Sequence, residues 1–197
     1  MIEHSFWKDK KVLITGHTGF KGSWISLFLK RLGANLHGLS LAPENGSMFK
    51  NLELSKLYTD EHYVDIRNTE IKDIITDLSP EIIIHMAAQP LVREGYLNPV
   101  QTHDVNIMGT INLFTSSLNL PNLLGILVVT TDKCYQNNEV LRGYKETDSM
   151  GGIDPYSASK ACVEIICTSY RESFFKDRGI KIASARSGNV IGGGDWS

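Results

Sequence analysis

The stretch Lys11-Val12-Leu13-Ile14-Thr15-Gly16-His17-Thr18-Gly19-Phe20-Lys21-Gly22 decides the fold of this chain of 197 residues. An apolar run leads into glycines spaced G-x-x-G-x-x-G, which is typical of the turn between a strand and a helix in a dinucleotide-binding unit. Gly16 would make the tight turn, Gly19 would admit phosphates, and Gly22 would let the helix pack on the strand. The N-terminus of such a helix favours a pyrophosphate. The stretch therefore predicts a nucleotide-binding turn, although such glycines can also be purely structural.

Apolar, β-branched runs alternate with helical patterns along the rest of the chain. Continuous apolar residues at 82–84 indicate a strand that is buried on both faces, as in a parallel sheet. The segment 41–59, which has no clean pattern, and the polar stretch 136–153 are expected to be loops. The spacing predicts strands at 11–15, 35–40, 62–66, 82–86, 125–131 and 180–186, and helices at about 22–32, 68–78, 98–118 and 155–177. We therefore predict an α/β fold, a Rossmann-type doubly wound parallel sheet with helices on both faces.

Composition excludes several classes of protein. The formal net charge of -2 leaves no basic field that would attract nucleic acid. No apolar run reaches the roughly 20 residues that span a bilayer, and the N-terminal segment lacks the pattern of a signal peptide. The cysteines, Cys134, Cys162 and Cys167, are unpatterned and the histidines are scattered, so we expect no metal site. A reduced protein of the cytoplasm is the simplest interpretation.

A second motif, Tyr156-x-x-x-Lys160, follows the helix-start signal Asp154-Pro155. Its two side chains are four residues apart and therefore share one face of the expected helix. A free tyrosine has a pKa of about 10, and a neighbouring ammonium group would lower that pKa toward neutrality. The pair could then take a proton from a sugar hydroxyl while the same carbon loses hydride to NAD⁺. An isolated Tyr–Lys pair is usually structural, but the glycine turn upstream favours catalysis here.

The expected strand 125–131 runs into Thr130-Thr131-Asp132-Lys133. In an open parallel sheet, ligands bind beyond the carboxyl ends of the strands, so these residues would face the cofactor crevice. An acid beside an amine suits elimination, because one protonates a leaving oxygen and the other removes a proton from carbon. The alternative is an ordinary solvated turn.

Taken together, these motifs resemble the extended short-chain dehydrogenase/reductase superfamily and its NAD-dependent epimerase/dehydratase family. Within that family the chain looks more closely like the CDP-glucose 4,6-dehydratases. Dehydratases of dTDP-glucose usually carry Asp-Glu where this chain has Asp132-Lys133, and this difference points to the CDP-glucose branch. The resemblance covers essentially the whole chain and rests on the segments 16–24, 87–93, 131–135, 156–161 and 188–196.

The resemblance implies a mechanism of dehydration. Tyr156 would take the proton of the C4 hydroxyl, assisted by Lys160 and Thr131, as hydride passes from C4 to NAD⁺. Lys133 would then remove the C5 proton and Asp132 would protonate the departing C6 hydroxyl, although the two roles can be drawn in either order. Hydride return to C6 would give CDP-4-dehydro-6-deoxyglucose and regenerate a tightly bound NAD⁺.

The resemblance also implies which residues contact ligands. Arg93 and Asn189 would contact the substrate, although Arg93 could equally be an exposed structural residue. The dinucleotide motif usually has an acidic residue at the end of the second strand, where this chain has Ser40, so NAD rather than NADP rests on the resemblance. The implied cofactor residues are Gly16, His17, Thr18, Gly19, Phe20, Lys21, Gly22, Ser40, Asp65, Ile66, Ala87, Ala88, Gln89, Thr130, Tyr156 and Lys160.

Members of this family imply two further expectations. One is a homodimer or higher oligomer, formed through the helices at 98–118 and 155–177. The other is a smaller C-terminal substrate domain, absent from the 197 residues or only begun in them. Two other functions stay open: another nucleotide-sugar enzyme such as a 4-epimerase, which needs no base at C5, and an NAD-binding module without turnover. The family also implies a role in deoxysugar and O-antigen biosynthesis.

Overall fold

A computed structural model describes residues 4–195 of the chain, and the uncertain ends, which include Trp196 of the last motif, lie outside the described residues. The described residues form one parallel six-stranded sheet with the order β3-β2-β1-β4-β5-β6. Its strands are β1 Lys11–Thr15, β2 Asn35–Ser40, β3 Tyr58–Tyr63, β4 Ile82–His85, β5 Gly125–Thr131 and β6 Lys181–Ser187. The order reverses between β1 and β4, which is where the crevice of a dinucleotide-binding fold opens. The predicted fold class is confirmed.

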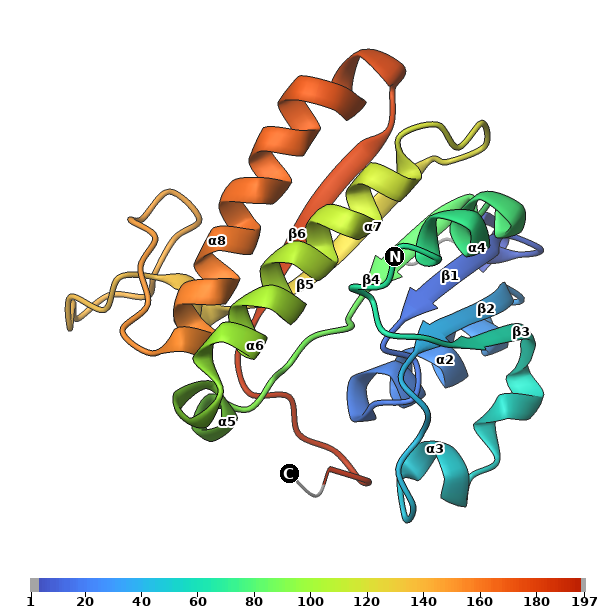
Figure 1. Cartoon of the computed structure of the whole chain (residues 1–197), viewed down its shortest axis with the longest axis horizontal. Coiled ribbons are helices and arrows are strands. Elements are labelled where there is room, and N and C mark those ends of the chain that lie inside the picture. Colours follow the sequence, from blue (N-terminus) through green and yellow to red (C-terminus); the bar gives the residue numbers. More distant parts are fainter. Residues whose placement is uncertain (1–3, 196–197) are drawn as a thin grey trace.

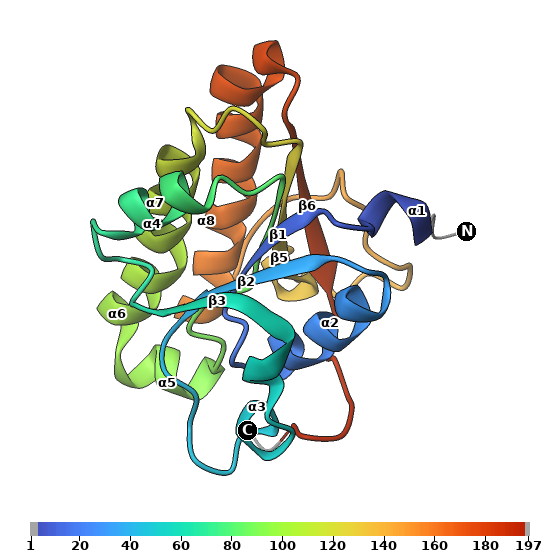
Figure 2. The same cartoon turned by 90° about the vertical axis from the view of Figure 1, so that its right-hand side faces the viewer.

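Helices cover both faces of this sheet (Figures 1 and 2). One face carries α4 Ile71–Leu78, α6 Pro99–His103, α7 Gly109–Ser117 and α8 Pro155–Tyr170. The other face carries α2 Phe20–Arg31. Shorter elements are α1 His4–Trp7, α3 Met48–Asn51, η1 Leu54–Leu57, α5 Val92–Leu97 and η3 Asp132–Cys134. The wider turn η2 Asp104–Met108 joins α6 to α7, and η4 Arg171–Phe175 with η5 Lys176–Arg178 prolongs α8, so both long predicted helices are nearly continuous.

The core divides into two layers because neighbouring residues of a strand point to opposite faces of the sheet. In β1, Leu13 packs into the larger cluster with Phe114 of α7 and Val163 of α8. Its neighbours Val12 and Ile14 pack into the smaller cluster, which includes Leu29 of α2. Burial on both faces explains why the central strands are continuous apolar runs.

The predicted elements differ from the structure chiefly in two regions, residues 41–66 and the segment of α5. The third strand is Tyr58–Tyr63, not 62–66, because it is a polar edge strand that the search for apolar runs misses. The predicted loop 41–59 is wrong in part, since buried Met48, Phe49 and Leu54 anchor α3 and η1 there. The helix α5 was also missed. The loop predicted at 136–153 is confirmed up to the start of α8.

Candidate active site

The glycine turn has the tight geometry that its sequence predicts. Gly16 has a φ of +73°, and a Cβ atom there would lie 2.7 Å from the Ala87 nitrogen. A Cβ atom on Gly22 would lie 2.3 Å from the Gly16 carbonyl oxygen. Gly19 begins α2 without a side-chain cap among the described residues, so the first N–H groups of this helix are free to meet an anion. The turn therefore fits a dinucleotide pyrophosphate.

His17 lies in this turn, but its side chain does not face the crevice. The imidazole is fully buried, and its Nε2 lies 2.9 Å from Glu61 Oε1 on β3. Burial lowers the His17 pKa, although Glu61 raises it in part. The ring fills the space beside Gly38 of β2, where a Cβ atom would lie 2.5 Å from the ring nitrogen. The sequence analysis placed His17 among the cofactor residues, but its buried ring is positioned to shape the turn.

Two polar residues of the turn, Thr18 and Lys21, form hydrogen bonds with residues at the ends of β2 and β6. Thr18 Oγ1 lies 2.8 Å from Ser40 Oγ, so the serine that replaces the usual acid is already hydrogen-bonded. Lys21 Nζ donates to Ser187 Oγ at 3.1 Å, and burial together with the charge of Lys133 lowers the Lys21 pKa. Phe20 lies against the segment that follows β6, since a Cβ atom built on Gly192 would be 3.3 Å from the Phe20 ring.

The segment after β4 is held in place from two sides. Thr15 Oγ1 accepts hydrogen bonds from the Met86 and Ala87 nitrogens at 3.1 and 3.2 Å. Half-buried Ala88 follows, and Gln89 Nε2 donates to Thr102 Oγ1 of α6 at 2.8 Å. The sequence places this segment at the cofactor crevice, and the structure gives it a rigid backbone there.

Asp65 and Ile66 follow β3 rather than belonging to it. The Asp65 carboxylate accepts hydrogen bonds from Arg67, at 2.7 Å from NH2, and these bonds hold the Asp65 pKa below its usual value. Arg67 also reaches Asp104 at 3.0 Å. Ile66 is buried in the larger core cluster and packs against Gly109 of α7. Asp65 is therefore the more accessible of the two.

Tyr156 and Lys160 lie in the first turns of α8, which the Asp154 side chain caps by accepting from the Ser157 nitrogen at 3.0 Å. The electrostatics at Tyr156 correct the expectation from sequence. Burial raises its pKa above 10, and the carboxylates of Asp154 and Asp132 raise it further, whereas a hydrogen bond with Thr131 lowers it. The loss of water around the phenol thus outweighs any stabilisation of the phenolate by neighbouring groups.

Lys160 is also buried, with its Nζ donating to the Val129 carbonyl of β5 at 3.4 Å. Burial lowers its pKa to about 8, and the charge of Lys21 contributes in the same direction. Lys21, Lys133 and Lys160 therefore form a chain of mutually repelling cations along the crevice. Such a group of positive charges would be stabilised by an anionic ligand.

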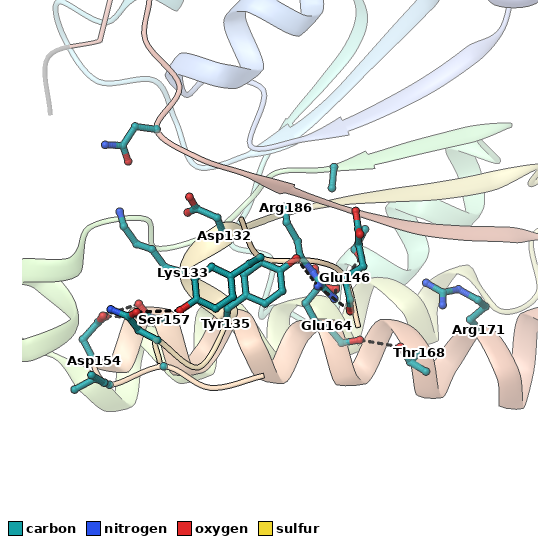
Figure 3. A pocket seen from close by; sticks show the side chains of 17 residues that line it. Asp132, Lys133, Tyr135, Glu146, Asp154, Ser157, Glu164, Thr168, Arg171 and Arg186 are labelled. Carbon is teal, nitrogen blue, oxygen red and sulfur yellow. Dashed lines mark hydrogen bonds and ion pairs between the residues drawn. The ribbon is translucent and has the colours of Figure 1, made fainter. Parts of the chain in front are cut away.

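The residues predicted for elimination and for substrate binding meet at an open cavity of about 1340 Å³ (Figure 3). Exposed Asp132 and Lys133, on η3, line it together with Asn189. Arg93 is exposed on α5 and does not line this cavity. Thr130 turns away from the crevice and donates to Glu164 of α8. Only its backbone can therefore face a cofactor.

The sequence analysis missed a buried polar group next to this cavity. Glu164 of α8 and Arg186 of β6 form an ion pair of 2.9 Å, and Arg186 also reaches Tyr135. The signal was present, because both charged residues fall within elements that were expected to be packed.

No group of three or more metal-binding side chains gathers within the part of the chain that the structure describes. Within the same residues, no helix has the length and apolar character to cross a bilayer.

Comparison with known proteins agrees with this geometry. The family model described as GDP-mannose 4,6 dehydratase matches residues 13–191. The chain is 46% identical to CDP-glucose 4,6-dehydratase of Salmonella typhimurium, over 100% of this chain and 56% of that protein. It is 31% identical to GDP-mannose 4,6-dehydratase of Vibrio cholerae, over 84% of this chain and 46% of that protein. The chain thus spans about half the length of these relatives.

Solved structures give the same picture. UDP-glucose 4-epimerase of Thermus thermophilus, a complex with NAD, aligns with a TM-score of 0.77 and 28% identity, covering 92% of this chain and 56% of that one. UDP-N-acetylglucosamine 4-epimerase of Methanobrevibacter ruminantium aligns with a TM-score of 0.80 and 25% identity, covering 94% and 56%. With the family model matching nearly the whole chain, this protein belongs to the GDP-mannose 4,6-dehydratase family of nucleotide-sugar epimerases and dehydratases.

Proposed function

We propose that this chain carries the cofactor site and the catalytic residues of a CDP-glucose 4,6-dehydratase. The reaction converts CDP-D-glucose to CDP-4-dehydro-6-deoxy-D-glucose with loss of one water. One observation carries the proposal: Asp132 and Lys133 stand side by side at the carboxyl end of β5, on the cavity next to the Tyr156 helix. The 46% identity to the Salmonella enzyme supports CDP-glucose as the substrate.

The cofactor in this proposal is NAD. The glycine turn fits its pyrophosphate, because the steric demands at Gly16 and Gly22 bring the backbone close and Gly19 leaves the helix N-terminus open. Ala87, Ala88 and Gln89 would border it on the β4 side, and Asp65 would lie toward the adenine. When bound, the cofactor would supply a positively charged hydride acceptor for C4 in its oxidised form and a hydride donor for C6 in its reduced form.

Tyr156 would act as the base for the C4 hydroxyl. Its buried phenol is protonated in the ligand-free chain, so removal of a proton requires positive charge near the oxygen. Lys160 can supply that charge, and it does so most fully below its own pKa of about 8. Thr131 already holds the phenol through a hydrogen bond. The proton of the C4 hydroxyl would therefore pass to Tyr156 with Thr131 fixing its position.

Asp132 and Lys133 would perform the elimination. A C4 ketone acidifies the C5 proton, which one of the pair removes while the other protonates the departing C6 hydroxyl. We assign the base to Lys133 and the acid to Asp132. Asn189 lines the same cavity and would hold the sugar nucleotide.

A 4-epimerase is the second candidate function, because the solved neighbours named above are epimerases. An epimerase needs no base at C5. The experiment is incubation with NAD⁺ and CDP-glucose in D₂O, followed by mass spectrometry and NMR of the nucleotide sugar. A dehydratase incorporates solvent deuterium at C5 and loses water, whereas an epimerase does neither.

Two variants sharpen this experiment. Lys133→Ala should lower deuterium incorporation and water loss by at least about 100-fold, since general base catalysis contributes factors of this size. Tyr156→Phe should stop the reaction before C5 exchange begins. Lys145→Ala, an exposed lysine of the 136–153 loop, is the matched control and should behave as the parent. Oxidation at C4 that is equally fast with and without Lys133, and a product of unchanged mass, would establish the epimerase instead.

Dimerisation through α6, α7 and α8 belongs to the same proposal. These helices lie side by side on one face (Figures 1 and 2), and Val100 of α6 and Ile165 of α8 are 81% and 60% exposed. Light scattering of the parent and a Val100→Asp, Ile165→Asp variant tests it, since a monomer in both cases would contradict the interface. The cytoplasmic location and the role in O-antigen biosynthesis stay predictions.

A further inference from the structure

Side chains from three separate elements meet in the wall of the cavity shown in Figure 3. Glu164 comes from α8, Arg186 from β6, and Tyr135 directly follows η3. Arg186 NH2 lies 2.9 Å from Glu164 Oε2, and Arg186 NH1 donates to the Tyr135 hydroxyl at 2.9 Å. None of these three residues takes part in the mechanism proposed above.

The carboxylate of Glu164 is the centre of this group. Its side chain is 4% exposed, and it accepts hydrogen bonds from Thr130 of β5 and from Ser184 and Arg186 of β6. Burial alone would raise the Glu164 pKa, but these three donors bring it below its usual value. Glu164 therefore stays ionised and joins α8 to both neighbouring strands.

Arg186 extends the connection to the loop. Its NH1 group donates to Tyr135 and to the Glu146 carbonyl at 3.3 Å, and its guanidinium carbon lies 4.9 Å from the centre of the Tyr135 ring. That ring stacks on Tyr144 with centres 5.1 Å apart and 15° between planes. Only a planar fork of donors can hold Glu164 and Tyr135 at once, so a lysine could keep the first contact but not both.

The turn between these contacts, residues 131–134, carries Asp132 and Lys133. Thr130 immediately precedes it and is bound by Glu164, whereas Tyr135 immediately follows it and is bound by Arg186. Within the turn, the Asp132 carboxylate accepts only a long hydrogen bond, 3.3 Å, from Thr131 Oγ1 among the described contacts. Both functional side chains are exposed, so the turn depends on its two ends for a fixed position.

We propose that the Glu164–Arg186 ion pair is a positioning device for the catalytic turn. It pins the turn through Thr130 at one end and Tyr135 at the other, and it fixes the 136–153 loop through Tyr135, Tyr144 and Glu146. The effect of this role on catalysis rests on the proposed function of Asp132 and Lys133. The mechanical role, which is to fix the position of the turn, is independent of that function.

Hydrogen exchange followed by mass spectrometry tests the mechanical role on the chain alone. Tyr135→Phe removes one acceptor but keeps the ring, and Arg186→Lys keeps the charge but loses the fork. Both should raise the exchange rate of backbone amides in 131–153 by about tenfold, because a lost hydrogen bond shifts local opening by this amount. Arg178→Lys, at an exposed arginine outside this segment, is the matched control and should leave exchange in 131–153 unchanged.

Two results would overturn the proposal. One is exchange in 131–153 that stays at the level of the Arg178→Lys control in both variants. The other is faster exchange spread evenly over the sheet, which would make the ion pair a general stabiliser. Because Tyr135→Phe leaves the buried pair intact, it keeps the test valid even if Arg186→Lys fails to fold.

Kinetics in D₂O then test the catalytic meaning. Tyr135→Phe should lower C5 deuterium incorporation about ten- to a hundredfold, since misplacement of a catalytic group has effects of this size, while oxidation at C4 keeps the parent rate. An equal loss in both steps would contradict positioning of this turn. If the parent shows neither step, the proposed function fails, and the exchange experiment still decides the mechanical role.

Discussion

The two turns at the carboxyl ends of β1 and β5 are built on different physical principles. At the first, Gly16 and Gly22 bring backbone atoms so close that a methyl group would overlap them. At the second, the turn that holds Asp132 and Lys133 is fixed by an ion pair and by hydrogen bonds from other elements. The comparison teaches that the close backbone packing of the first turn can be predicted from its own glycines. The ion pair that fixes the second turn involves residues far away in the sequence.

The largest expected effect on stability comes from removing the ion pair that fixes the second turn. Glu164→Ala leaves Arg186 without its carboxylate and should lower the free energy of unfolding by about 3 kcal/mol, as for other broken buried pairs. Glu172→Ala in the prolonged end of the same helix removes an exposed pair with Lys176 and should leave the denaturation midpoint unchanged. Urea denaturation of both variants measures the difference. Equal midpoints would show that the ion pair contributes no stability.

The next effect concerns the steric side. Gly22→Ala places a methyl group 2.3 Å from the Gly16 carbonyl and should lower the unfolding free energy by about 2 kcal/mol, the usual scale of overpacking. Gly19→Ala meets its nearest atom at 3.4 Å and should keep the parent stability while weakening NAD binding. Thermal unfolding and NAD titration separate the two. A stable Gly22→Ala chain that binds NAD normally would refute the packing role.

A smaller effect comes from Lys160, whose pKa is lowered by burial and by the charge of Lys21 in the first turn. It releases its proton at about pH 8 in the folded chain and near 10.5 when unfolded, so between these values the unfolded chain binds more protons. Stability contributed by this group therefore rises with pH across that window and is reduced at neutral pH. Lys160→Met should stabilise the ligand-free chain at pH 7 by about 1 kcal/mol and flatten this dependence. A destabilised variant at pH 7 would contradict the unfavourable burial of the ammonium.

Much of the fold followed from the sequence, and the exceptions have physical causes. Strands β1, β2 and β5 were predicted at their observed ends, and all three are interior strands whose residues are buried or half-buried. Strand β3 was misplaced because an edge strand can be polar. Whether an apolar residue such as Phe49 lies in a loop or a short helix depends on what it packs against. A local sequence pattern does not reveal these packing partners.

Sequence motifs indicated candidate site residues but could not indicate the electrostatics of the site. Tyr156, Lys160, Asp132 and Lys133 were named from motifs, yet the raised Tyr156 pKa arises from burial, which no motif reports. The partners of Arg186 lie 22 and 51 positions away, so only the folded chain brings them together. His17 shows the same limit, because its neighbour Glu61 belongs to the misplaced strand.

The most direct test of the proposed function is the mass of CDP-glucose after incubation with the purified chain and NAD⁺. The account predicts a nucleotide sugar lighter by one water, formed by the parent and not by Tyr156→Phe. A product of unchanged mass with an inverted C4, or unchanged CDP-glucose in the presence of bound NAD, would contradict 4,6-dehydration by this chain.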